Sequence, residues 1–267
     1  MASETKAANA EIWRDDINDP NYGYHIVALS TAMFFILSRI VVFCVPQVAK
    51  KSTWKWKNIM VSFIHSIISS IWAVACFYER PDMAEDLITV FTVLSHSLTS
   101  FSVGYFVYDL FDLMTTRSSR QSVELMGHHV VIITCFMVAV CWRHYVGYAV
   151  VALLVEINSV FLHFRQLLQI CGVSKFNGWY RLNSLTNLAT FIVFRILLLS
   201  WMTRWMVINR DAVPLVFYSL GSVGLAVMVA MNITLFYRLL RSDFISLKDT
   251  DDSACGGTAA PTCKKGE

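Results

Sequence analysis

Seven long apolar blocks follow one another along the chain, and short polar segments separate them. About 20 apolar residues in a helix are enough to cross the hydrocarbon core of a bilayer. Backbone groups find no water there, so spanning segments are helices or strands of a closed barrel, and these blocks have the length of helices. The pattern predicts an all-α polytopic membrane helical bundle of about seven transmembrane helices, and polar interruptions in two blocks allow six to eight. The blocks cover residues 24–45, 57–78, 87–114, 125–142, 145–170, 183–203 and 213–237.

Composition agrees with a membrane protein and helps to divide the chain. Hydrophobic residues make up 56% and charged residues 15%, whereas a soluble domain has about 25% charged residues. Residues 1–22 are polar and lack the apolar core of a signal peptide, so we expect an extracellular or lumenal N-terminus. Residues 23–49 are expected to form the first transmembrane helix and its loop, and residues 50–244 the main membrane domain. The polar residues 245–267 predict a disordered cytosolic tail.

The distribution of Lys and Arg predicts the orientation, because cytosolic loops carry an excess of both. Arg39, Arg165 and Arg195 are left out because they lie inside apolar blocks. The side of the N-terminus then holds six basic residues, Lys6, Arg14, Arg80, Arg143, Arg204 and Arg210. The opposite side holds thirteen, namely Lys50, Lys51, Lys55, Lys57, Arg117, Arg120, Lys175, Arg181, Arg238, Arg241, Lys248, Lys264 and Lys265. We therefore expect the N-terminus outside and the C-terminus in the cytosol. The basic residues form no continuous patch, so no nucleic-acid partner is expected.

Polar residues inside the blocks recur at helical spacing. A charged side chain at the centre of a bilayer costs about 2.5–3.5 kcal/mol by insertion scales, so such residues usually face a bundle interior or a cavity. Hydroxyl groups can instead bond to their own helix or help helices to pack. The aligned sets are Ser62, His65, Ser66 and Ser69; Ser95, Ser102, Asp109 and Asp112; Glu156, Ser159 and His163; and Asn183 with Asn187.

Two adjacent histidines, His128 and His129, begin the fourth block. Neighbouring residues on a helix point about 100° apart, so one ring can face a cavity while the other meets a helix. An imidazole oriented by Asp109 or Asp112 is a plausible general base for a hydroxyl or an amine. His128, His129, Asp109 and Asp112 are therefore the candidate catalytic residues, and polar contacts between helices are the alternative. No metal site is expected, because adjacent histidines diverge on a helix.

Five further residues are candidates for binding a lipid head group or carbonyl at membrane depth. A buried ion pair between Glu156 and Arg195 that sets helix register, or a hydrogen bond of His65 between helices, is the structural alternative. The candidates are His65, Glu156, Asn158, Asn187 and Arg195.

Several stretches, taken in order, resemble the TLC (TRAM–LAG1–CLN8 homology) domain family of multi-span membrane proteins, and most closely its subgroup of TLC domain-containing proteins 1 and 2. They extend over residues 50–244, and their order and spacing are more specific than any single stretch. They are WKWKNIMVSFIHSIISSIWA (54–73), FSVGYFVYDLFDLM (101–114), GHHVVIITC (127–135), HYVGYAVVALLVEINSVFLHFRQLL (144–168), LATFIVFRILLLSWM (188–202) and RLLRSDF (238–244).

The resemblance implies a role in lipid handling. The subgroup is associated with the phospholipid composition and fluidity of the plasma membrane, where it restrains incorporation of polyunsaturated acyl chains. The ceramide-synthase branch of the family is catalytic, and its double histidine corresponds to His128 and His129 here. That branch also carries H-D-x-x-D one helix later, where this chain has VEINS with Glu156 and Asn158. This departure speaks against ceramide synthesis itself.

Three functional hypotheses follow. The first is regulation of phospholipid composition and fluidity by a protein that binds phospholipids or acyl chains in an intramembrane cavity of the plasma membrane. The second is an acyltransferase that uses acyl-CoA as its substrate, and the third is an ion-channel modulator or transporter. No cofactor is expected under any of them, and the endoplasmic reticulum is the alternative location.

Overall fold

The computed structural model describes residues 19–115 and 120–245, and every regular element in these ranges is helical. The predictions for the N-terminal segment, apart from its last residues, and for the C-terminal tail lie outside the described residues. The seven predicted membrane segments are present, which confirms the all-α polytopic bundle. Their helices are α2 (Tyr22–Phe43), α3 (Thr53–Glu79), α4 (Val93–Met114), α5 (Arg120–Trp142), α6 (Val146–Leu153), α7 (Glu156–Ile170), α8 (Gly178–Phe191), α9 (Leu198–Ile208) and α10 (Leu215–Leu240).

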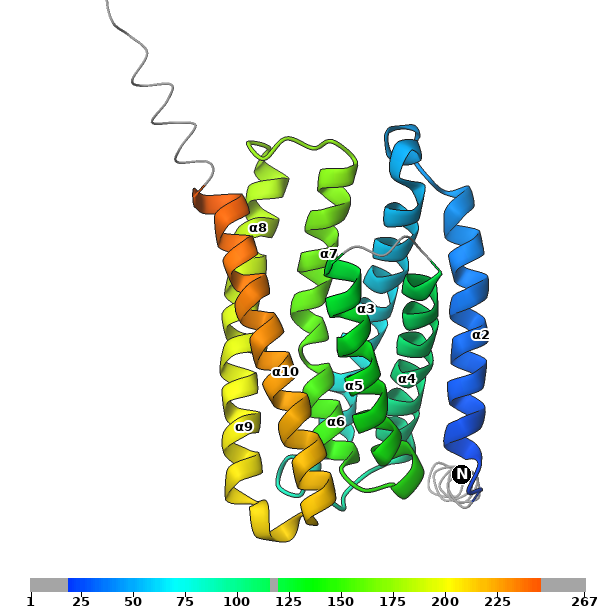
Figure 1. Cartoon of the computed structure of the whole chain (residues 1–267), viewed down its shortest axis with the longest axis vertical. Helices are drawn as coiled ribbons and strands as arrows, with labels where there is room; N and C mark the ends of the chain where they lie inside the picture. Colours follow the sequence, from blue (N-terminus) through cyan, green and yellow to red (C-terminus); the bar gives the residue numbers. More distant parts are fainter. Residues whose placement is uncertain (1–18, 116–119, 246–267) are drawn as a thin grey trace, which may run out of the picture.

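Two of the membrane segments contain irregular backbone that the apolar pattern does not predict. The segment that begins at α6 is interrupted by a turn at Leu154 and Val155 before α7 starts. The segment formed by α8 and α9 contains a π-helical stretch, η3 (Ile192–Leu197), near its middle. A second π-helical stretch, η5 (Arg241–Ile245), follows α10. Figure 1 shows the segments running along one axis, with the start of α2 and the end of α10 at opposite ends of the bundle. We name these ends the Tyr22 end and the Asp243 end.

Helix α4 is the most extensively buried helix, although it is the only one of the seven predicted segments in the described residues that is not apolar enough to count as a membrane span. The other six are long and apolar enough to cross a membrane by length and composition, and α4 is not among them. It packs against α2, α3, α5 and α6. Every residue of α4 from Ser95 to Phe106 is buried. A polar helix is tolerated here because neighbouring helices, rather than lipid, surround it.

Several hydroxyl groups of α4 and α2 donate to backbone carbonyls. Thr99 and Ser100 donate to the carbonyls of Ser95 and His96 on their own helix, at 2.9 Å in both cases. Between helices, Ser30 of α2 donates to the carbonyl of Phe101 at 2.7 Å. The hydroxyl groups of these residues therefore bond to their own helix or join two helices, which was the alternative to a position facing a cavity.

A glycine lets α2 approach α4 closely. A Cβ built on Gly104 would lie 2.6 Å from the Cβ of Ser30 and 2.7 Å from the carbonyl oxygen of Val27. Small residues at a helix crossing allow such contact between backbones. Since the clash includes a backbone atom, no side-chain rotation can relieve it.

A buried ion pair fixes the end of α10. Arg165 of α7 pairs with Asp243 of η5, and the Arg165 Nε to Asp243 Oδ2 distance is 2.6 Å. Tyr180 and Ser184 of α8 also donate to this carboxylate, at 3.1 and 2.6 Å. Their hydrogen bonds satisfy the buried charge and connect α7, α8 and η5 at one point.

We predict that Gly104→Ala lowers the free energy of unfolding by about 1–3 kcal/mol, the usual cost of overpacking. Gly127→Ala is the matched control, because a Cβ there meets nothing within 4 Å. It should be neutral or stabilise by up to about 1 kcal/mol through helix propensity. Thermal unfolding of both variants in the same detergent tests this, and equal melting temperatures would contradict it.

We predict that Asp243→Asn destabilises the protein by about 3–5 kcal/mol, because it leaves Arg165 buried without its counter-ion. Glu124→Gln is the control, since Glu124 and Arg238 form a pair whose side chains are each 46% exposed. Loss of such an exposed pair costs about 0–1 kcal/mol. Denaturation curves would refute the prediction if the two variants lost the same stability.

Candidate functional site

A cavity of about 840 Å³ lies between α5 and α10, with residues of α3, α4, α6, α7 and α9 completing its wall. Pockets for small molecules usually measure about 300–1,000 Å³. The lining includes Arg165, Arg238 and Ser242 at the Asp243 end and Trp205 and Phe217 at the Tyr22 end. The cavity therefore follows the bundle over most of its length.

Most of the wall is apolar. Helix α10, which covers the cavity, buries few of its own residues, namely Gly224, Leu225, Asn232 and Leu239. Gly224 faces α5, where a Cβ would lie 3.1 Å from the sulfur of Cys135. The apolar lining includes Phe106, Ile132, Phe136, Leu153, Leu199 and Met228. A wall of this kind suits a hydrocarbon chain.

His129 and Asp109 meet at the cavity wall. The distance from His129 Nε2 to Asp109 Oδ2 is 3.4 Å, and both side chains are buried. Asn58 of α3 donates to the other oxygen of Asp109 at 2.7 Å. Asp112, one turn further on, forms an ion pair with Lys57 and does not line the cavity. The carboxylate placed to orient a histidine is therefore that of Asp109.

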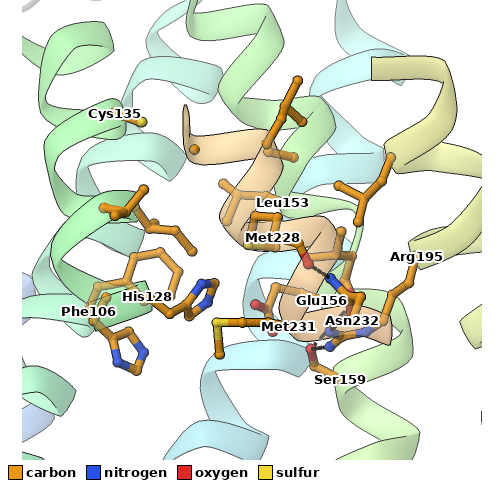
Figure 2. Close-up of a pocket in the computed structure, with 18 of the residues that line it drawn as sticks. Phe106, His128, Cys135, Leu153, Glu156, Ser159, Arg195, Met228, Met231 and Asn232 are labelled. Atoms are coloured by element: carbon orange, nitrogen blue, oxygen red, sulfur yellow. Dashed lines mark hydrogen bonds between the residues drawn. The ribbon is translucent and has the colours of Figure 1, made fainter. Parts of the chain in front are cut away.

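His128 reaches into the cavity from α5 (Figure 2). Its ring centroid lies 5.4 Å from that of His129. His129 also belongs to the lining, although its ring is buried against Phe106 at 5.7 Å. The two rings point differently, as expected for neighbours on a helix, yet both border the same space.

Glu156 and Arg195 face the cavity from the side opposite α5 (Figure 2). Ser66 donates to Glu156 Oε2 at 2.6 Å. Arg195 donates from Nε to Asn158 at 2.6 Å and from its two terminal nitrogens to Asn232 and Ser159, at 2.8 Å each. Within residues 19–115 and 120–245, no carboxylate lies within the 4.0 Å ion-pair distance of Arg195. The buried ion pair between Glu156 and Arg195 that the sequence offered as an alternative is therefore not formed in the described part of the chain.

Three of the expected lipid-binding residues lie outside the cavity lining. His65 stacks on Tyr105 with ring centroids 3.8 Å apart and lies 3.4 Å from the hydroxyl of Ser102. Asn158 donates to the carbonyl and the side-chain oxygen of Asn187, at 2.9 Å each. The structure places these three groups between helices, where they contact one another or their neighbours.

Other residues that line the cavity were not among the candidates. His163 and Ser159 continue the stripe of Glu156, so their position follows from the spacing already noted. Asn232 is a polar residue in the last apolar block, which by itself could have marked it. Arg238 lies at the end of α10, and no sequence signal distinguishes it from other basic residues at helix ends.

Comparison with known proteins identifies the family. The model of the TLC domain matches residues 55–241. TLC domain-containing protein 2 of Danio rerio is 56% identical over 201 residues, which are 75% of this chain and 81% of that protein. TLC domain-containing protein 1 of Homo sapiens is 35% identical over 192 residues, covering 72% and 76% of the two chains. TLC domain-containing protein 2 of Homo sapiens is 35% identical over 200 residues, or 75% of each chain. The resemblance in the sequence is confirmed: the chain belongs to the TLC domain family, within the subgroup of proteins 1 and 2.

Proposed function

We propose that this membrane protein binds acyl chains of membrane lipids in its cavity and thereby regulates the phospholipid composition and fluidity of the plasma membrane. Limiting the incorporation of polyunsaturated chains is the activity that the family resemblance implies. The observation that carries the proposal is the long cavity of about 840 Å³ inside a membrane bundle. Its apolar wall suits a hydrocarbon tail, and Glu156 and Arg195 offer polar contacts to the end of a chain.

A recess beside the cavity supports the same proposal. A smaller recess of about 410 Å³ lies between α9 and α10. Met206, Leu225 and Ala230 line both this recess and the cavity. Few side chains therefore separate the cavity from the surface between α9 and α10. A lipid tail that enters between these helices would pass from the bilayer into the cavity without contact with water.

We place the N-terminus outside the cell and the C-terminus in the cytosol, on the distribution of Lys and Arg. The described chain begins and ends at opposite ends of the bundle (Figure 1), as this orientation requires.

We predict that Ala152→Phe weakens binding of a labelled acyl chain by about tenfold or more, the ratio that 1.4 kcal/mol produces. Ala152 lines the cavity, so a phenyl ring there occupies space that a tail would use. Ala28→Phe on α2 is the matched control, because Ala28 is exposed on the outer surface. The measurement is equilibrium binding to purified protein, and equal affinities in both variants would exclude the cavity as the site.

The same two variants test the cellular role. Cells that lack the protein should incorporate more polyunsaturated chains into plasma-membrane phospholipids. The Ala28→Phe variant should reverse this change and Ala152→Phe should not. An unchanged phospholipid profile after removal of the protein would refute the proposed regulation.

A second candidate function is acyl transfer from acyl-CoA, which the contact between His129 and Asp109 favours. In this reaction the acceptor hydroxyl or amine attacks the thioester carbonyl, and the carbon–sulfur bond breaks. His129, oriented by Asp109, would accept the acceptor's proton and pass it to the departing CoA thiolate. The products are an ester or amide and free CoA.

If this candidate is right, His129→Ala should lower turnover by about 10²–10⁴-fold, the usual contribution of general base catalysis. His25→Ala is the control, because the His25 side chain is 74% exposed on α2. Release of CoA from acyl-CoA by purified protein with a lysophospholipid or a lipid amine measures the rate. If the wild-type chain shows no turnover, acyl transfer to these acceptors is rejected and acyl binding remains.

A further inference from the structure

Arg195 occupies an unusual position in the fold. It lies in the π-helical stretch η3, near the middle of the 31-residue segment Gly178–Ile208. Single π-helical turns within α-helices often occur at functional sites. Arg195 also lines the cavity, and Figure 2 shows its side chain extending toward Asn232 and Ser159. A permanent positive charge is therefore held beside the cavity at membrane depth.

The partners of Arg195 are neutral. Its three hydrogen bonds go to the side-chain oxygens of Asn158, Asn232 and Ser159. A guanidinium carries five N–H donors and stays protonated in proteins. After the three hydrogen bonds, one N–H remains on each of the two terminal nitrogens. Two adjacent donors suit the two oxygens of a carboxylate, the geometry in which Arg binds such groups best.

The surrounding charges do not take up these donors. Glu156 interacts electrostatically with Arg195 but lies beyond ion-pair distance, and its Oε2 accepts from Ser66. Arg238 and Arg165, the other two arginines of the lining, already face the carboxylates Glu124 and Asp243. Among the arginines that line the cavity, Arg195 alone lacks a carboxylate within ion-pair distance in the described part of the chain.

We infer that the ligand of the cavity is a hydrocarbon chain ending in a free carboxylate, a fatty acid rather than an esterified chain, and that Arg195 binds this carboxylate. The inference rests on the proposed binding of acyl chains and adds the chemical class of the ligand. A neutral ester carbonyl can accept a hydrogen bond from Arg195 but brings no charge. A carboxylate supplies both the oxygens and a negative charge in direct contact with the guanidinium, which Glu156 does not.

The experiment compares two probes with the same tail, oleate and methyl oleate, on the purified, delipidated full chain at a pH where oleate is ionised. We expect the wild type to bind oleate about ten- to hundredfold more tightly, as charge-assisted hydrogen bonds predict. Arg195→Gln should remove this preference, so that its affinities for oleate and methyl oleate lie within about twofold of each other. Arg238→Gln, which removes another arginine of the lining, should keep the preference.

The outcomes separate this inference from the proposed function. Equal affinities of the wild type for both probes, or a preference retained in Arg195→Gln, would overturn the inference while leaving acyl binding intact. Failure of both probes to bind the wild type would instead refute the proposed function. Should Arg195→Gln not fold, Glu156→Gln provides the test. Removing this neighbouring carboxylate should strengthen the preference for oleate, and an unchanged preference would contradict the role of Arg195.

Discussion

The structure depends on one constraint, namely that polar groups at membrane depth have to find their partners inside the protein. Helix α4 shows the consequence most clearly. It has too many Ser, Thr and Asp residues to count as an apolar span, yet α2, α3, α5 and α6 pack around it and bury most of its residues. Its neighbours shield it from lipid. Carbonyls of α4 accept hydrogen bonds from its own Thr99 and Ser100 and from the hydroxyl of Ser30 on α2. A polar helix is thus surrounded by other helices rather than excluded from the membrane.

Under the same constraint, one half of the bundle is closely packed and the other contains the cavity. Around α2 and α4, small side chains and Gly104 bring the backbones into contact and leave a solid interior. Around α10, few residues are buried, and the partners of Arg195 hold α7, η3 and α10 together by side chains that span the distance. Small residues close the first interface, whereas the long side chain of Arg195 bridges the second one. The cavity lies in this second half.

The sequence predicts the helices well, because the length and spacing of apolar blocks depend only on local residues. It also predicts that the stripes of Ser62, Ser66 and Glu156 face inward. It does not decide between Asp109 and Asp112, which share one face of α4. The choice depends on α3, where Asn58 meets Asp109 and Lys57 meets Asp112. Nor does it reveal the turn at Leu154 and Val155 or the π-helical stretch Ile192–Leu197, since neither contains Gly or Pro. Contacts with other helices also decide the roles of His65 and Asn187. Both are polar residues in apolar blocks and therefore resemble site residues, but the structure shows that they contact Tyr105 and Asn158 instead.

The hydrogen bonds of Arg195 connect the architecture to the chemistry of the cavity. Arg195 cannot point outward without exposing its charge to lipid, and it cannot be enclosed without partners. Asn158 and Ser159 hold it from α7, and Asn232 holds it from α10. These contacts fix the distance between the inner and outer walls of the cavity and leave the charge at its edge. Arg195 therefore links the two walls of the cavity and also presents a positive charge to its interior. A ligand that reaches this charge also contacts the link between the walls.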